Sequence, residues 1–138
     1  PEYQKYLNEL KLDIRKRGLN KKIKFLGFRD DITSILDKSN FFIHTPISPD
    51  PLPTVIFEAI MCKTPVITNN LGGAYEILDE GNNGLIIKNN LVEESAKNIL
   101  AYLDKKKQQK KNVEKAFNYV CNNFSQEQFK RKILNTIG

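Results

Sequence analysis

The chain has 138 residues, of which 40% are hydrophobic, and its formal net charge is +6. This length supports one domain with a hydrophobic core, and the composition is that of a folded chain, which excludes a largely disordered protein. No apolar run approaches the roughly 20 residues of a membrane-spanning helix, and the opening PEYQKYLNEL shows no signal-peptide pattern.

In chain order, the hydrophobic pattern predicts alternating helices and strands. Helices are expected over 2–17, from Asp30 or Asp31 to about 38, and over 53–62, 74–79 and 92–103. A further helix is expected to end at about residue 122, and a last helix at residue 136. Strands are expected over 22–26, 41–45, 65–68 and 85–87. Short apolar strands that alternate with helices indicate an α/β fold, a Rossmann-like parallel sheet with helices on both faces. Ligands bind such sheets beyond the carboxyl ends of the strands. The loops that hold Arg29, Asp50 and Gly72 each follow a predicted strand, so we expect them to meet at one edge.

Residues 40–76 contain two carboxylates, Asp50 and Glu58, presented in different ways. Pro51 and Pro53 disfavour helix at the residues before them, so Asp50 belongs to an extended loop. The helix that follows is apolar over 55–61 except at Glu58, a pattern typical of a buried helix. A buried carboxylate needs hydrogen-bond donors, supplied either by the chain itself or by a hydroxyl-rich ligand.

The start of this helix is also a candidate phosphate site, because the first N–H groups of a helix are free and carry partial positive charge. Its prolines subtract two donors, which leaves the amides of Leu52, Thr54 and Val55. The later pair Gly72-Gly73 would let the main chain approach a ligand closely, although both could equally be ordinary turn glycines.

Together these segments are similar to a known signature. DPLPTVIFEAIMCKTPVITNNLGGAYEIL (50–78) resembles the donor site of the retaining, nucleotide-sugar-dependent glycosyltransferases of the GT-B fold, the glycosyl transferases group 1 family. IKFLGFRDDI (23–32) and NNGLII (82–87) extend the resemblance over nearly the whole chain. One departure is Asp50, where the family pattern has Glu, and it leaves the fine contact with the donor sugar open.

The resemblance implies a role for each candidate residue. Glu58 would hold the ribose hydroxyls of the nucleotide, and Asp50 would face hydroxyls of the donor sugar. The segment Leu52, Pro53, Thr54 and Val55 would bind the donor phosphates. Gly27, Phe28 and Arg29 would border the base, with core packing as the alternative for Phe28, and Gly72 and Gly73 would lie against the donor.

The resemblance also implies the wider setting. We expect residues 1–138 to form a single donor-binding domain, the C-terminal half of a GT-B fold, and we expect the chain to be N-terminally truncated or a naturally short relative, since it opens on a helix. The substrate would be a UDP-, GDP- or ADP-linked sugar, with no cofactor and no metal. An N-terminal acceptor domain would complete the enzyme, so the chain alone is expected to be inactive. Two alternatives are a non-catalytic nucleotide-binding module and a sugar-nucleotide epimerase of the same fold; the Asp50–Glu58 signature argues against the second.

Location and further partners are inferred from cysteines and charge. Cys62 and Cys121 have no metal or redox spacing, which favours a reducing, cytoplasmic setting. If the acceptor is lipid-linked, we expect the protein at the inner face of the membrane. A run of lysines has three interpretations: a solvated helical face, attraction to an anionic membrane surface, or nucleic-acid binding. We expect no nucleic-acid partner, because no aromatic platform accompanies the lysines. The run comprises Lys105, Lys106, Lys107, Lys110 and Lys111.

Overall fold

The computed structural model describes residues 2–88 and 91–137, which divide into two compact units, Pro1–Asp30 and Asp31–Gly138. The helices are α1 (Glu2–Lys16), α2 (Ile32–Asp37), α3 (Thr54–Met61), α4 (Ala74–Ile77), the 3₁₀ turn η1 (Asp79–Gly81), α5 (Val92–Leu103), α6 (Lys106–Asn123) and α7 (Gln126–Ile137). The strands are β1 (Phe42–His44), β2 (Val66–Asn69) and β3 (Leu85–Ile87). That the whole chain forms one donor-binding domain stays a prediction.

The first unit consists of α1 and an irregular segment. Gly18 ends the helix with a positive φ of 66°, and the N–H of Leu19 donates to the carbonyl of Ile14 at 2.9 Å. The strand predicted over 22–26 is wrong: the N–H groups of Lys22 and Ile23 turn back to the carbonyl of Leu19, and residues 23–27 pair with no strand in the described part of the chain. A strand without a partner has no ladder to stabilise it. The loop that holds Arg29 therefore does not follow a strand.

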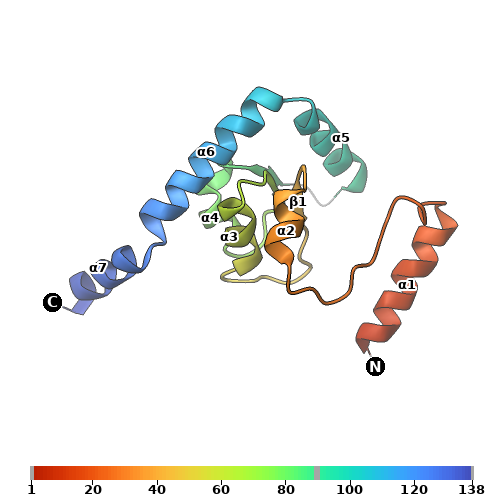
Figure 1. Cartoon of the computed structure of the whole chain (residues 1–138), viewed down its shortest axis with the longest axis horizontal. Helices are drawn as coiled ribbons and strands as arrows, with labels where there is room; N and C mark the ends of the chain where they lie inside the picture. Colours follow the sequence, from red (N-terminus) through yellow and green to blue (C-terminus); the bar gives the residue numbers. More distant parts are fainter. Residues whose placement is uncertain (1, 89–90, 138) are drawn as a thin grey trace. The chain divides into compact units, whose positions relative to one another are not determined.

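The second unit is built on a three-stranded parallel sheet in the order β1-β2-β3. Figure 1 labels β1 of this sheet and the helices α2 to α7 of the same unit. Phe42 pairs with Val66, and Ile67 pairs with Leu85. All three strands were predicted within one or two residues of their observed bounds. The parallel arrangement is confirmed.

Successive residues of β2 point to opposite faces of the sheet, and each face is covered by helices. Val66 belongs to the larger core with α3, α4 and α6, whereas Ile67 belongs to a second core with Tyr102 of α5. The predicted α/β fold with helices on both faces is thus confirmed. No helix among residues 2–88 and 91–137 is long and apolar enough to cross a bilayer.

Candidate functional site at the carboxyl edge of the sheet

The loops that follow β1 and β2 meet at the carboxyl edge of the sheet. Because the two strands are parallel and His44 pairs with Thr68, both loops leave the sheet on the same side. The N–H of Gly73 donates to the carbonyl of Asp50 at 2.8 Å. The structure thus brings together Asp50, Gly72 and Gly73, three of the residues singled out from the sequence.

The two glycines are required by this contact. Gly72 has a φ of +73°, and a Cβ at this position would overlap the main chain of Asp50. A Cβ on Gly73 would overlap the carbonyl oxygen of Pro51. The close approach that the glycines allow is therefore an approach of two loops of the chain, and a contact of the glycines with donor stays a prediction.

The side chain of Asp50 shapes the entry into α3. Its Oδ1 atom accepts a hydrogen bond from the N–H of Leu52 at 3.0 Å, an Asx turn at an exposed position. Pro53 follows as the N-cap residue, with a φ of −68°. The amide of Leu52 thus already has an acceptor, and the free donors of the first turn are those of Thr54 and Val55.

Glu58 is exposed, contrary to the expectation of burial. Only one face of α3 meets the core: Ile56, Ala59 and Ile60 are buried and Phe57 packs against the core, while the side chain of Met61 is 52% exposed. Among the described residues, no side-chain hydrogen bond or ion pair engages the Glu58 carboxylate. The argument that Glu58 is buried and must therefore find a donor does not hold, and its contact with a ligand stays a prediction.

A cleft of about 510 Å³ opens at the same edge. It takes residues from the ends of all three strands: Pro46, Ile47, Asn69, Asn70, Leu71, Ile87 and Lys88. Asn69 fixes the loop after β1, because its Nδ2 donates to the carbonyl of Pro46 at 2.8 Å, and its buried Oδ1 has no partner in the described part of the chain. Sequence reasoning did not select these residues. The signal was present in the polar pair Asn69-Asn70, which lies at the end of an apolar strand.

The remaining candidates lie in the first unit. Gly27 has a φ of +68°, and the side chain of Phe28 is 98% exposed, so its alternative role in core packing is wrong. The contact of Gly27, Phe28 and Arg29 with the base stays a prediction.

The acidic and cysteine side chains do not form a metal site in the part of the chain that the structure describes: no group of three or more His, Cys, Asp or Glu is arranged to hold an ion. That the donor is used without a metal is a separate prediction, and it concerns the bound substrate as well as the chain.

Comparison with known proteins places this geometry in a family. Residues 3–119 match the protein family described as "Glycosyl transferases group 1". The Methanocaldococcus jannaschii protein "Uncharacterized glycosyltransferase MJ1069" is 28% identical over 109 residues, which is 78% of this chain and 28% of the relative. Among solved structures, Anabaena HepE in complex with UDP-glucose is 30% identical, with a TM-score of 0.85, and the match covers 97% of this chain and 37% of HepE. A glycosyltransferase from Rickettsia africae is 29% identical, with a TM-score of 0.86 and coverage of 98% and 36%.

The chain thus spans little more than a third of these solved proteins. The family match covers far more than half of the chain and includes the Asp50 loop, α3 and the diglycine loop. The chain belongs to the glycosyl transferases group 1 family, and its fold is that of the GT-B glycosyltransferases.

Proposed function

We propose that this chain is the donor-binding part of a retaining glycosyltransferase that moves a sugar from a nucleotide-sugar to a glycan or lipid-linked acceptor. The observation that carries the proposal is the meeting of the Asp50 loop, the start of α3 and the diglycine loop at one edge of the sheet. The similarity to HepE, which was solved in complex with UDP-glucose and with UDP, supports a nucleotide-sugar as the donor.

In this proposal Glu58 binds the ribose hydroxyls of the nucleotide. Its exposure supports the role, because a carboxylate that makes no bond to the chain keeps all its acceptor capacity for a ligand. Two hydrogen bonds from hydroxyls to a charged carboxylate contribute about 1.5–3 kcal/mol each.

The donor phosphates lie, in this proposal, at the start of α3. The amides of Thr54 and Val55 point out of the first turn, where the helix carries partial positive charge. During transfer, negative charge develops on the leaving phosphate, so the same amides stabilise the transition state. Asp50 faces the donor sugar and orients it, with its carboxylate held by the Asx turn.

The acceptor belongs to a separate domain in this proposal. The chain alone supplies one wall of the reaction site and is inactive without the acceptor-binding part. The reaction is placed in cell-surface polysaccharide biosynthesis, in the cytoplasm at the inner face of the membrane, and it proceeds without a metal ion.

Titration calorimetry of UDP, GDP and ADP into the chain tests the donor site. We expect one nucleotide to bind selectively and Glu58→Ala to weaken it at least about tenfold, which corresponds to roughly 1.4 kcal/mol. Glu94→Ala, an exposed glutamate on α5, is the matched control and should leave the affinity unchanged.

Equal affinity in Glu58→Ala and the wild-type chain would show that Glu58 is not a ligand. If none of the three nucleotides binds to the chain, the proposal that these residues suffice to capture the donor is wrong.

A further inference from the structure

A second hollow, distinct from the candidate donor site, lies between η1 and α6. This groove has a volume of about 480 Å³ and is called here the lysine groove; it is lined by Gly81, Asn82, Lys107, Gln108, Lys111, Asn112 and Lys115. Gly81 and Asn82 belong to the segment that leads into β3, so the groove lies on the side of the amino end of that strand. The candidate donor site lies at the opposite, carboxyl edge of the sheet.

The three lysines of the groove form one row along α6. Residues four apart in a helix are neighbours on one face, and the row from Lys107 to Lys115 is about 12 Å long. Lys107 and Lys111 repel each other, as do Lys111 and Lys115, because like charges four residues apart destabilise a helix. No ion pair joins these lysines to a carboxylate within residues 2–88 and 91–137.

The start of α6 adds to this repulsion. Lys105 is the N-cap residue, and the first turn contains lysines and no acidic residue. Positive charges at a helix N-terminus oppose the helix dipole, so this arrangement is unfavourable for the folded chain by itself. Lys106 has a packing role, since its Nζ lies 5.6 Å from the ring centre of Phe41. Packing of this kind does not account for the lysines of the groove.

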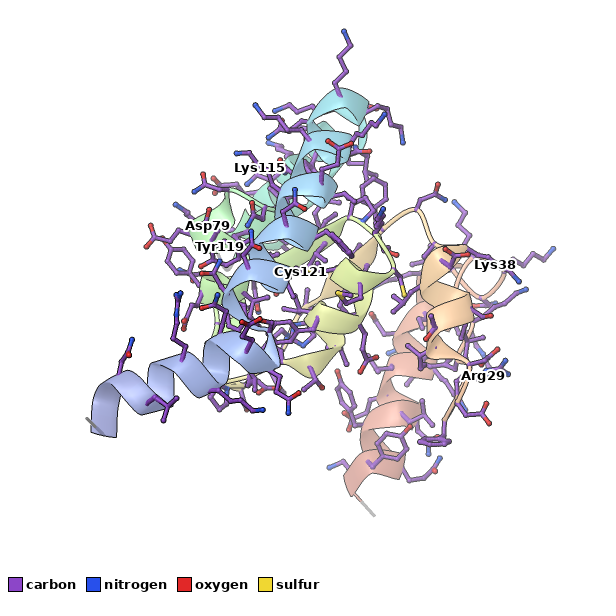
Figure 2. All side chains as sticks on the ribbon, turned by 60° about the vertical axis from the view of Figure 1, so that its left-hand side comes forward. Arg29, Lys38, Asp79, Lys115, Tyr119 and Cys121 are labelled. Carbon is purple, nitrogen blue, oxygen red and sulfur yellow. The ribbon has the colours of Figure 1, made fainter. Side chains whose placement is uncertain are left out.

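Acidic residues of the α4–η1 segment lie near one end of the groove. Figure 2 shows Asp79 on the same side of the molecule as Lys115 and Tyr119. Burial and then the charges of Asp79, Glu76 and Glu80 raise the pKa of Tyr119, one turn beyond Lys115. Lys107 and Lys111, at the start of α6, form no ion pair with a carboxylate of the described residues, and an anion there would relieve both the repulsion between lysines and the unfavourable helix end.

We propose that the lysine groove binds the phosphate groups of anionic lipids and holds this face of the protein on a membrane surface. A row of flexible lysine ammonium groups suits several phosphates spread over a surface, because lysine acts as a point charge without the fixed fork of arginine. No aromatic ring lines the groove, so it lacks the stacking platform typical of single-stranded nucleic-acid sites. This surface suits an acceptor anchored in the membrane, and it leaves the carboxyl edge of the sheet free for donor.

Vesicle flotation tests the proposal. The probes are vesicles of phosphatidylcholine alone and vesicles with equal parts of phosphatidylcholine and phosphatidylglycerol. The groove variant carries Lys107→Glu, Lys111→Glu and Lys115→Glu; the control variant carries Lys16→Glu, Lys21→Glu and Lys22→Glu, three exposed lysines of the first unit with the same change in net charge. We expect the wild type and the control to bind the anionic vesicles, and the groove variant to bind at least about tenfold more weakly. Added salt should weaken the wild-type binding.

Three results would overturn the proposal. They are equal binding of the groove and control variants, equal binding of the wild type to neutral vesicles, and binding of inorganic pyrophosphate or single-stranded RNA in the absence of vesicle binding. A milder variant, with glutamine at the same three positions, must show the same loss with an unchanged circular dichroism spectrum. Nucleotide titration of the groove variant should equal that of the wild type, so failure here and failure of the proposed donor site are separate results.

Discussion

At the scale of single residues, the candidate site depends on contacts between main-chain atoms. The N–H of Gly73 donates to the carbonyl of Asp50, and the carbonyl oxygen of Pro51 leaves no space for a Cβ on Gly73. Its φ of −70° is accessible to any residue, so the glycine is needed for space and not for an unusual backbone conformation. A substitution at Gly73 therefore tests the contact between the two loops directly.

We expect Gly73→Ala to lower the free energy of unfolding by about 1–3 kcal/mol, because the added methyl group forces the Asp50 loop away from its position. Urea unfolding measures this change, and nucleotide titration should show a parallel loss of affinity. Gly81→Ala is the control: Gly81 has a φ of +93°, but a Cβ there meets only ordinary contacts, so its cost is about 1–2 kcal/mol of backbone strain without an effect on nucleotide binding. Unchanged stability and affinity in Gly73→Ala would contradict the steric role.

At the scale of elements, α5 and α6 are joined by a buried polar network. Gln109 donates from Nε2 to the carbonyls of Tyr102 and Leu103 at the end of α5, the second at 3.0 Å. Asn112 donates from Nδ2 to the hydroxyl of Tyr102 at 3.3 Å. These bonds satisfy terminal carbonyls that a helix leaves open. They also connect α5, which packs on one face of the sheet, with α6, which packs on the other.

This network predicts a dependence of stability on alkaline pH. Burial raises the pKa of Tyr102 above its usual value of 10.0, and the bond from Asn112 opposes this only in part. The folded state therefore keeps the proton more tightly than the unfolded state. The contribution to stability is fully present below pH 10 and is lost as the pH rises through the higher folded-state pKa.

Tyr102→Phe should remove this alkaline loss, with a cost of about 1 kcal/mol at neutral pH because Asn112 loses its acceptor. The free energy of unfolding, measured for both proteins at neutral pH and above pH 10, gives the difference. If the wild type and the variant lose stability in parallel above pH 10, the buried hydroxyl is not responsible.

At the scale of the whole molecule, both hydrophobic cores lie within the second unit. The larger core extends from Leu36 to Val120, and the smaller one includes Ile67, Ile87 and Tyr102. A chain needs such cores to remain folded, and the first unit contributes no buried member to either one among the described residues.

We therefore expect a chain of residues 31–138 to fold without the first unit. Its free energy of unfolding should stay within about 1 kcal/mol of the value for unfolding of the second unit in the full chain. Chemical denaturation followed by circular dichroism checks this result. The same shortened chain should lose selectivity among UDP, GDP and ADP if Gly27, Phe28 and Arg29 border the base; retained selectivity would exclude that role.

Particular elements show how far the sequence alone leads. The strand LII at 85–87 and the strand at Val66–Asn69 were predictable because short apolar runs between turn residues have few alternatives. The segment KIKFL has the same local pattern, yet it pairs with no strand in the part of the chain that the structure describes, so nothing there stabilises it as a strand. The burial of Glu58 was predicted from an apolar helix, and the prediction failed because only one stripe of α3 meets the core.

The sequence by itself determined the α/β class, the parallel sheet, the family and the candidate residues Asp50 and Glu58, because local periodicity and motif spacing are properties of consecutive residues. Only the tertiary structure decided which loops touch, why Gly72 and Gly73 are glycines, and that Asn69 secures the loop after β1. It also showed that two lysines of the run, Lys107 and Lys111, line a groove beside η1 together with Lys115. These features depend on contacts between residues far apart in the chain, and such contacts exist only once the sheet has fixed the strands beside one another.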